Sequence, residues 1–154
     1  MLYLLALLIG IVAGLRAMMA PLAISVAAHF DWLNLNGTFL EFLGYKWTPL
    51  ILLVAAIGEL ITDQLPSTPS RKVPVQFGTR ILMGAATGGA IGVAAGSLWI
   101  GAVVGIVGAI IGTLGGSAAR AKMAAAFGKD RPAALIEDAV AIVGAILIVV
   151  VLKS

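Results

Sequence analysis

The chain has 154 residues, of which 61% are hydrophobic and only 11% are charged. Soluble domains contain about 45–50% apolar and about 25% charged residues, so this composition excludes an ordinary soluble domain. The absence of cysteine, the single histidine and the net charge of +3 argue against disulfides, metal clusters and nucleic-acid binding. We therefore expect an all-α integral membrane protein, with residues 1–154 forming one transmembrane domain and no cofactor or metal.

The first apolar segment, about 2–28, contains an arginine, Arg16, within the sequence GIVAGLRAMMAPLAIS. An arginine at the centre of a lipid-facing helix costs roughly 2.5–3.5 kcal/mol on insertion scales. We expect this span to be broken near Gly14 and Pro21, so that the guanidinium can reach a carboxylate.

Further apolar segments follow in chain order. Residues 81–119 carry no charge, and as a single helix they would be about twice as long as the ~30 Å hydrocarbon core. We place a turn at the sequence GSLWIG, which makes the third and fourth spans a glycine-rich helical hairpin. The predicted fold is a polytopic bundle of about five spans, the last four at about 48–65, 79–97, 100–119 and 133–152.

The connecting segments differ in charge. The segment 29–47 carries Trp32, Tyr45 and Trp47, which are typical of a headgroup interface. Under the positive-inside rule, the basic segments 66–78 and 120–132 lie in the cytoplasm, with the N-terminus inside and the C-terminus outside. The basic residues in these two segments are Arg71, Lys72, Arg120, Lys122, Lys129 and Arg131.

Glycines recur at four-residue spacing in the third and fourth spans. This spacing lets helix backbones approach closely in lipid. The pattern predicts packing within a hairpin or between copies in a homo-oligomer, and a glycine-lined conduit is the alternative. The predicted helix-packing residues are Gly84, Gly88, Gly92, Gly96, Gly101, Gly105, Gly108, Gly112 and Gly116.

Several ionisable residues lie within or at the edge of the spans. Such residues mark ion or substrate paths in membranes more often than they stabilise the packing of the helices. We therefore predict a substrate-binding or proton-relay cluster. We expect Glu59 to be the partner of Arg16. The alternative is a set of ion pairs that holds the helices in register. The candidate residues are Arg16, Glu59, Asp63, Arg80, Glu137 and Asp138.

The sequence also contains a weak internal repeat. GLRAMMA at 14–20 is similar to GTRILMG at 78–84, with Gly, Arg and Met at matching places. Internal repeats are a feature of many transporters.

Four segments together resemble a known family: GLRAMMAP, GELITDQLPSTPSR, GTRILMGAATGGAIG and LIEDAVAI. Over nearly its whole length the chain is similar to the bacterial membrane proteins grouped as the domain-of-unknown-function family DUF4126. This resemblance implies a multi-pass protein of the bacterial inner membrane and implies no particular activity.

Three functions remain open at this point. The preferred one is a small oligomeric transporter or channel whose charged cluster handles an anionic substrate or protons. The second is a non-catalytic structural or assembly subunit, and the third is a membrane enzyme that modifies lipid phosphates with carboxylate-bound Mg²⁺. The expected partners are membrane lipid, further copies of the chain, and a small anion or proton.

Overall fold

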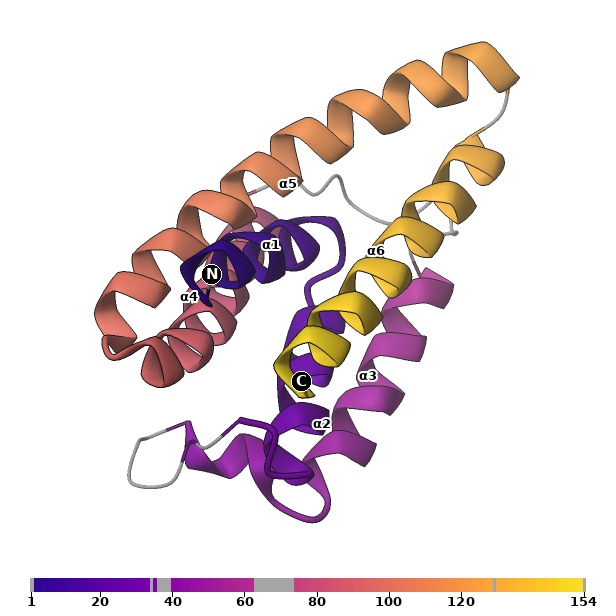
Figure 1. The fold of residues 1–154 in the computed structure, drawn as a ribbon. Coiled ribbons are helices and arrows are strands. Elements are labelled where there is room, and N and C mark those ends of the chain that lie inside the picture. The colour runs from indigo at the N-terminus through magenta and orange to yellow at the C-terminus, as the bar shows by residue number, and fades with distance from the viewer. Residues whose placement is uncertain (1, 34, 36–39, 63–73, 129, 154) are drawn as a thin grey trace.

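The computed structural model describes residues 2–33, 35, 40–62, 74–128 and 130–153, and within these ranges it contains helices and no strand. The predicted all-α class is confirmed. In chain order the elements are α1 (Leu2–Leu15), α2 (Met19–His29), the short 3-10 helix η1 (Glu41–Gly44), α3 (Thr48–Thr62), α4 (Pro74–Ala95), α5 (Leu98–Phe127) and α6 (Asp130–Lys153) (Figure 1).

Helices α4 and α5 form an antiparallel hairpin in which glycines bring the two backbones into contact. A Cβ added at Gly84 would lie 2.7 Å from the Gly105 carbonyl oxygen, and one at Gly88 would lie 2.7 Å from the Gly105 Cα. A Cβ at Gly92 would lie 2.8 Å from the Gly101 Cα. Real Cβ atoms essentially never come this close to a backbone atom, so the hairpin requires glycine at these positions.

The turn of this hairpin falls at the predicted GSLWIG sequence. Gly96 has a φ of +107°, a conformation that glycine adopts without strain, and the Ser97 side chain caps α5 by accepting a hydrogen bond of 3.3 Å from the Ile100 amide. A Cβ at Gly96 would meet nothing within 4 Å. The prediction that Gly96 packs against a neighbouring helix is therefore wrong, because its role is in the turn.

Helix α1 packs on α5 through a second set of backbone contacts. A Cβ at Gly14 would lie 2.8 Å from the Gly112 Cα, and one at Gly108 would lie 2.9 Å from the Ile11 nitrogen. The spacing of Gly10 and Gly14 matches the spacing of the glycines on α5, so the first segment carries a stripe of its own. Like those of the hairpin, these contacts join helices of the same chain.

The order of these contacts gives the direction of α1. Along α5 they move from Gly105 to Ala109, while along α1 they move from Gly10 to Gly14, so the two helices run parallel. The start of α1 therefore lies near the start of α5, and the end of α1 lies toward the later turns of α5.

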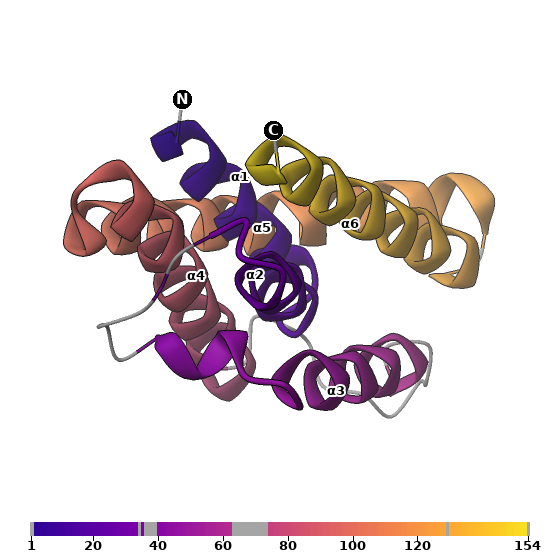
Figure 2. The same cartoon turned by 60° about the horizontal axis from the view of Figure 1, so that its bottom comes forward.

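Helix α6 runs in the opposite direction to α1. A Cβ at Gly144 would lie 3.4 Å from a Val12 methyl carbon, whereas Asp138, earlier in α6, contacts Arg16 at the end of α1. The start of α1 and the end of α6 are consequently on the same side of the molecule (Figure 2).

This arrangement corrects the predicted side of the N-terminus relative to the basic segments. The prediction put the N-terminus on the side of the basic segments 66–78 and 120–132, with the C-terminus opposite. In the structure the start of α1 and residues 120–127 lie toward opposite ends of α5, because the first apolar segment forms two helices, α1 and α2.

The predicted connecting segments are also partly helical. Residues 120–127 are the last turns of α5, and residues 74–78 are the first turn of α4, while residues 66–73 lie outside the described ranges. The charges after residue 119 predicted the end of the fourth span, but the alanine-rich stretch that follows has high helix propensity and continues the helix.

Two described helical stretches are long and apolar enough to cross a membrane, Leu98–Phe127 and Leu135–Leu152. Three shorter apolar stretches accompany them, Leu2–Leu15, Met19–His29 and Thr48–Glu59. Large apolar side chains are exposed along α3, α5 and α6, among them Ile51, Trp99 and Leu147. The multi-pass arrangement in a membrane stays a prediction.

The two members of the predicted repeat have different backbones. Residues 78–84 lie inside α4, whereas residues 14–20 contain the break between α1 and α2. The likeness of GLRAMMA and GTRILMG in sequence therefore does not extend to their local structure.

Candidate functional site

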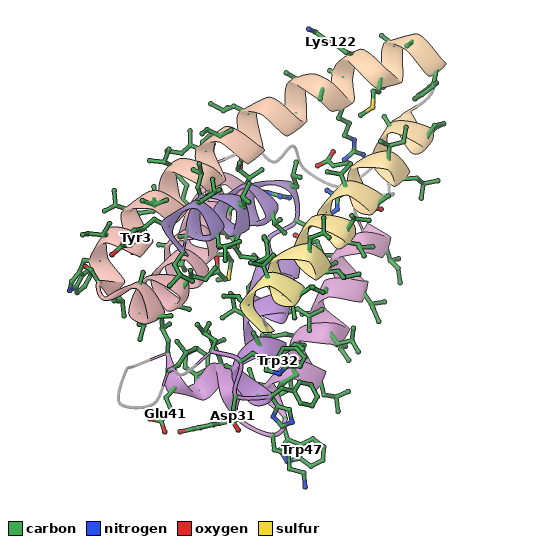
Figure 3. The ribbon with its side chains drawn as sticks, viewed as in Figure 1. Tyr3, Asp31, Trp32, Glu41, Trp47 and Lys122 are labelled. Atoms are coloured by element: carbon green, nitrogen blue, oxygen red, sulfur yellow. The ribbon has the colours of Figure 1, made fainter. Side chains whose placement is uncertain are left out.

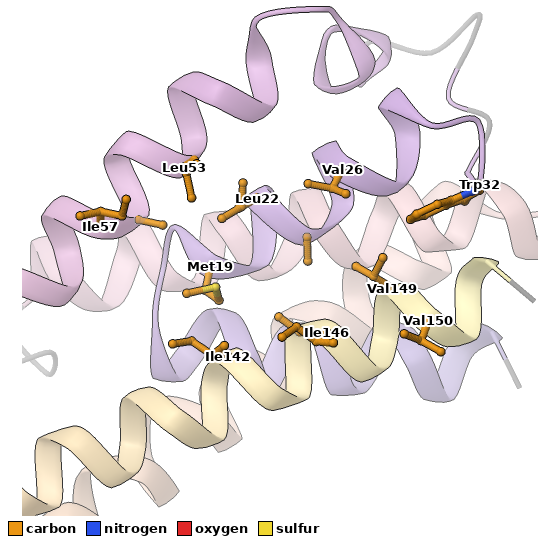
Figure 4. Close-up of a pocket in the computed structure, with 13 residues that line it drawn as sticks. Met19, Leu22, Val26, Trp32, Leu53, Ile57, Ile142, Ile146, Val149 and Val150 are labelled. Atoms are coloured by element: carbon orange, nitrogen blue, oxygen red, sulfur yellow. The ribbon is translucent and has the colours of Figure 1, made fainter.

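The break between α1 and α2 spans Arg16, Ala17 and Met18, between the predicted positions Gly14 and Pro21. The Arg16 amide still donates to the Val12 carbonyl at 2.7 Å, and α2 starts at Met19. Pro21 lies in the first turn of α2, where its missing N–H costs no helical hydrogen bond. Helix α2 then runs alongside α6 and in the same direction, with Met19 beside Ile142 and Val26 beside Val149 (Figure 4). Because α6 runs opposite to α1, the chain turns back at a residue whose side chain is charged.

The Arg16 side chain is completely buried, with 0% of its surface exposed. Its Nη1 donates to Glu137 Oε1 at 3.0 Å and to the Leu15 carbonyl at 2.7 Å. Its Nε donates to Asp138 Oδ1, and Nη2 forms an ion pair with the same carboxylate. Such hydrogen-bonded contacts with two carboxylates offset the cost of burying a guanidinium.

Glu59, on α3, binds the other side of the break. Its two carboxylate oxygens accept hydrogen bonds of 3.0 Å from the Ala17 and Met18 amides. These amides belong to the two residues directly before α2, and a negative charge is favourable close to a helix N-terminus. The sequence prediction paired Glu59 with Arg16. The carboxylates that the structure describes on Arg16 are those of Glu137 and Asp138 on α6, whereas Glu59 is described on the break amides and near Arg80.

Arg80, on α4, lies at the carboxyl end of α1. Its Nη1 donates to the Gly14 carbonyl at 2.8 Å, and its Nη2 lies 3.9 Å from Glu59 Oε2. The Thr113 hydroxyl donates to the same Gly14 carbonyl at 3.4 Å. With 4% of its surface exposed, Arg80 does not extend to an interface but interacts with the end of the helix.

The two ends at the break therefore carry opposite charges from other parts of the chain. Cations (Arg16 and Arg80) bind the carbonyls that end α1, and an anion (Glu59) binds the two amides directly before α2. Each charge matches the sign that the helix dipole favours at that end. We call Arg16, Glu59, Arg80, Glu137 and Asp138 the break cluster.

The structure thus brings together five of the six predicted site residues. The sixth, Asp63, lies outside the described ranges. Glu59 is the most accessible of the carboxylates, with 19% of its side chain exposed against 4% for Glu137 and 12% for Asp138.

The sequence prediction missed two participants. Arg120 Nη1 lies 4.0 Å from Glu137 Oε2, although the charge pattern placed Arg120 in a connecting loop. Thr113 is one uncharged residue within a span and had no predicted role. Their positions on α5, seven residues apart and therefore on one helix face, are the signal that would have found them.

The fold and the site define a class: an all-helical protein with a buried arginine–carboxylate cluster at a helix break. The family model described as a domain of unknown function, DUF4126, matches residues 3–151, so the chain belongs to this family. Comparisons with curated proteins and with solved structures give no match.

Proposed function

We propose that the chain is a small bacterial inner-membrane transporter in which α1 and α2 form a re-entrant hairpin with the break cluster at its tip. Helix α1 has 14 residues and α2 has 11, which makes them about 21 Å and about 16 Å long. Both are shorter than a ~30 Å hydrocarbon core. Helices that end inside a membrane occur where protein groups satisfy their ends, as in many transporters.

The observation that carries this proposal is the pairing of charges with the two helix ends at the break. In transporters with interrupted helices, the amino end of a half-helix binds an anionic substrate group, and unwound carbonyls bind cations. In this chain Glu59 occupies the anion position on the Ala17 and Met18 amides, and Arg80 occupies the cation position on the Gly14 carbonyl.

A proton-coupled exchange follows from this chemistry. The guanidinium groups of Arg16 and Arg80 keep their charge at any physiological pH, whereas a carboxylate can take up a proton. A protonated Glu59 would accept more weakly from the Ala17 and Met18 amides, so a small anion could replace it beside Arg80. In this mechanism one proton and one anion move together, and their release restores the contacts of Glu59 with the two amides.

The proposed orientation combines the helix directions with the charges of the connecting segments. The basic residues of 66–78 and 120–132 place the ends of α3 and α5 in the cytoplasm under the positive-inside rule. Trp32 and Trp47 lie at the other end of the molecule from Lys122 (Figure 3). With α1 parallel to α5, the N-terminal end of α1 and the C-terminal end of α6 are both placed outside.

Flux measurements on the full chain in lipid vesicles test the proposal. Vesicles with a trapped pH indicator are given inward gradients of acetate, inorganic phosphate or chloride in turn. We expect internal acidification beyond that of empty vesicles with at least one anion, and its loss in Glu59→Gln. The matched control Glu41→Gln, which changes a carboxylate at the distant η1, should behave as wild type. Flux that survives Glu59→Gln unchanged would reject the exchange mechanism.

A second candidate function, a structural membrane subunit, is favoured by the complete burial of Arg16 between Glu137 and Asp138. In that case the cluster only holds α1 against α6. The neutral triple variant Arg16→Met, Glu137→Gln, Asp138→Asn should then fold, and any flux that the wild-type chain shows should be kept. For a transporter, the same variant should fold and show no flux.

The remaining alternatives gain no support from the described residues. No three His, Asp or Glu side chains within the described ranges lie close enough together to hold a metal ion. The lipid-modifying enzyme stays an untested alternative. Homo-oligomer formation stays a prediction, since the glycine contacts on which it rested are made between helices of one chain.

A further inference from the structure

We propose that the anion carried at the break cluster is a small monocarboxylate, such as formate or acetate, which takes the place of the Glu59 carboxylate; this rests on the proposed transport function. In the structure Glu59 of α3 presents the same chemical group to the break. The side chain thereby shows which kind of anion these amides and the nearby guanidinium of Arg80 accept.

The two amides of the break bind one carboxylate through both of its oxygens. The Ala17 amide donates to Glu59 Oε2 and the Met18 amide donates to Glu59 Oε1, each at 3.0 Å. A carboxylate thus supplies one acceptor oxygen for each donor. A halide offers a single centre to both donors, and phosphate or sulfate adds oxygens beyond the pair that these amides bind. The backbone of the break is therefore matched to a carboxylate in geometry as well as in charge.

A buried cation completes the site. Arg80 Nη2 lies 3.9 Å from Glu59 Oε2, so the oxygen that binds the Ala17 amide also faces a guanidinium that is only 4% exposed. Nη1 of the same guanidinium donates to the Gly14 carbonyl at 2.8 Å. Because this second contact does not involve Glu59, it can hold the guanidinium beside the break when the glutamate carboxylate leaves. The cation is then in place for an incoming carboxylate.

The charges of the described residues favour an anion with a single charge. When all are ionised, three positive and three negative groups meet here and sum to zero. Protonation of Glu59 leaves three positive charges against two negative ones, and one monovalent anion restores the balance. A dianion would add an excess negative charge among largely buried side chains, where an uncompensated charge is costly. The groups counted are Arg16, Arg80, Arg120, Glu59, Glu137 and Asp138.

The position of the Glu59 carboxylate favours a small anion. The carboxylate lies between α3 and the break, where Ala17 is 4% exposed. The Glu59 side chain itself is 19% exposed, so its carboxylate has an open side by which it can leave and another can enter. An anion that consists of little more than a carboxylate needs no space beyond what Glu59 gives up.

Binding of added carboxylates to variants of Glu59 gives a direct test that does not require transport. Glu59→Ala removes the carboxylate and opens its space, whereas Glu59→Gln keeps the shape and corresponds to the protonated side chain. We expect sodium formate and sodium acetate to raise the thermal unfolding midpoint of both variants in detergent by at least about 2 °C more than that of wild type. The shift should saturate, because a ligand that binds only the folded chain stabilises it as its site fills.

Other salts at the same ionic strength show whether the site selects a monocarboxylate. Methanesulfonate has the single charge and the methyl group of acetate but three oxygens, chloride has no pair of oxygens, and oxalate has two charges. All three should raise the midpoints of the Glu59 variants less than acetate does. The control Glu41→Gln changes a carboxylate in η1 and measures the general effect of each salt on stability.

The outcomes separate this inference from the proposed function. Equal shifts by acetate, methanesulfonate and chloride would overturn the monocarboxylate and leave an anion site for the proposed transporter. Shifts by acetate that are as large in Glu41→Gln as in the Glu59 variants would overturn the carboxylate site. If no anion shifted even Glu59→Gln, which preserves the shape of the side chain, the anion site and the proposed function would both be overturned. Shifts specific to formate and acetate in a chain that shows no flux would support the carboxylate site and overturn transport alone.

Discussion

The two sides of this molecule are held together differently. On one side, α1, α4 and α5 touch through backbone atoms at glycines such as Gly84, Gly88 and Gly105. On the other side, α2, α3 and α6 meet through large apolar side chains and leave a groove of about 500 Å³ between them. A backbone contact leaves no room for adjustment, whereas side chains around a groove permit changes in spacing. The glycine side is therefore the more tightly packed of the two.

The break cluster lies where these two sides meet. Arg16 directly follows α1 and Arg80 belongs to α4, both on the glycine side. Glu59 and Asp138 belong to α3 and α6 on the groove side. The fixed charges are thus carried by the glycine side, and the carboxylates that can take up protons are carried by the helices around the groove. The proposed coupling of protonation to transport relies on this division.

Breaking the link between the two sides should have the largest effect on stability. Arg16→Met leaves Glu137 and Asp138 buried beside an apolar side chain, which costs about 3–5 kcal/mol when a buried pair loses one partner. The thermal unfolding midpoint in detergent should fall strongly, and adding Glu137→Gln and Asp138→Asn should recover much of the loss. Lys122→Met, at an exposed position of α5, is the control. A single variant as stable as wild type would show that the cluster is not buried.

Disturbing the glycine side should have the next largest effect. A Cβ at Gly105 would press on the α4 backbone at Gly84 and Gly88, so Gly105→Ala should cost about 1–3 kcal/mol through overpacking. Gly115→Ala, ten residues further along α5, meets nothing within 4 Å and should stabilise the helix by up to about 1 kcal/mol. Both changes in stability are measured by thermal unfolding in detergent. Equal effects of the two substitutions would contradict close backbone contact between α4 and α5.

Removing the carboxylate that binds the amides of the break should have a moderate effect. Glu59→Ala removes the carboxylate that accepts from the Ala17 and Met18 amides, and each such hydrogen bond contributes about 0.5–1.5 kcal/mol. Glu41→Ala, whose carboxylate lies in η1, serves as the comparison and should change the unfolding midpoint little. A loss from Glu59→Ala as large as that from Arg16→Met would show that Glu59 belongs to the buried ion pair after all.

Truncating a wall of the groove should have the smallest effect. Leu53 is 43% exposed and borders the groove, so Leu53→Ala removes few contacts and should cost about 1 kcal/mol or less. Its unfolding midpoint in detergent is compared with that of Gly105→Ala. If Leu53→Ala destabilised the chain more than Gly105→Ala did, the groove side would be the tightly packed one, and the contrast between the two sides would be reversed.

Much of this fold could be predicted from the sequence, and the parts that could not have physical causes. The turn at Gly96 and Ser97 was predictable, because a glycine and a capping serine in an interfacial sequence define it locally. The convergence of charges was predictable, because an arginine such as Arg16 needs a partner in an apolar surrounding. The direction of the chain after the break was not predictable, since hydrophobic patterning does not show whether the next helix continues forward or runs back.

Which carboxylates pair with Arg16 also could not be predicted from the sequence. Carboxylates such as Glu59 and Asp138 have the same charge, and only the packing of α3 and α6 decides which of them reaches Arg16. The extent of α5 was misjudged for a related reason. Arg120 and Lys122 suggested a connecting loop, but a charged residue near the end of a long helix can stay helical and extend toward another charge.

The reversal of the chain at Arg16 is the central claim, because it makes the break the tip of a hairpin. Since the chain has no cysteine, single cysteines can be introduced at Tyr3, Trp47 and Lys122 and labelled in intact cells with a membrane-impermeant maleimide. We expect Tyr3→Cys and Trp47→Cys to react from the same side and Lys122→Cys only after the membrane is opened. Reaction of Tyr3→Cys together with Lys122→Cys, on the side opposite to Trp47→Cys, would contradict the hairpin and restore a single first span.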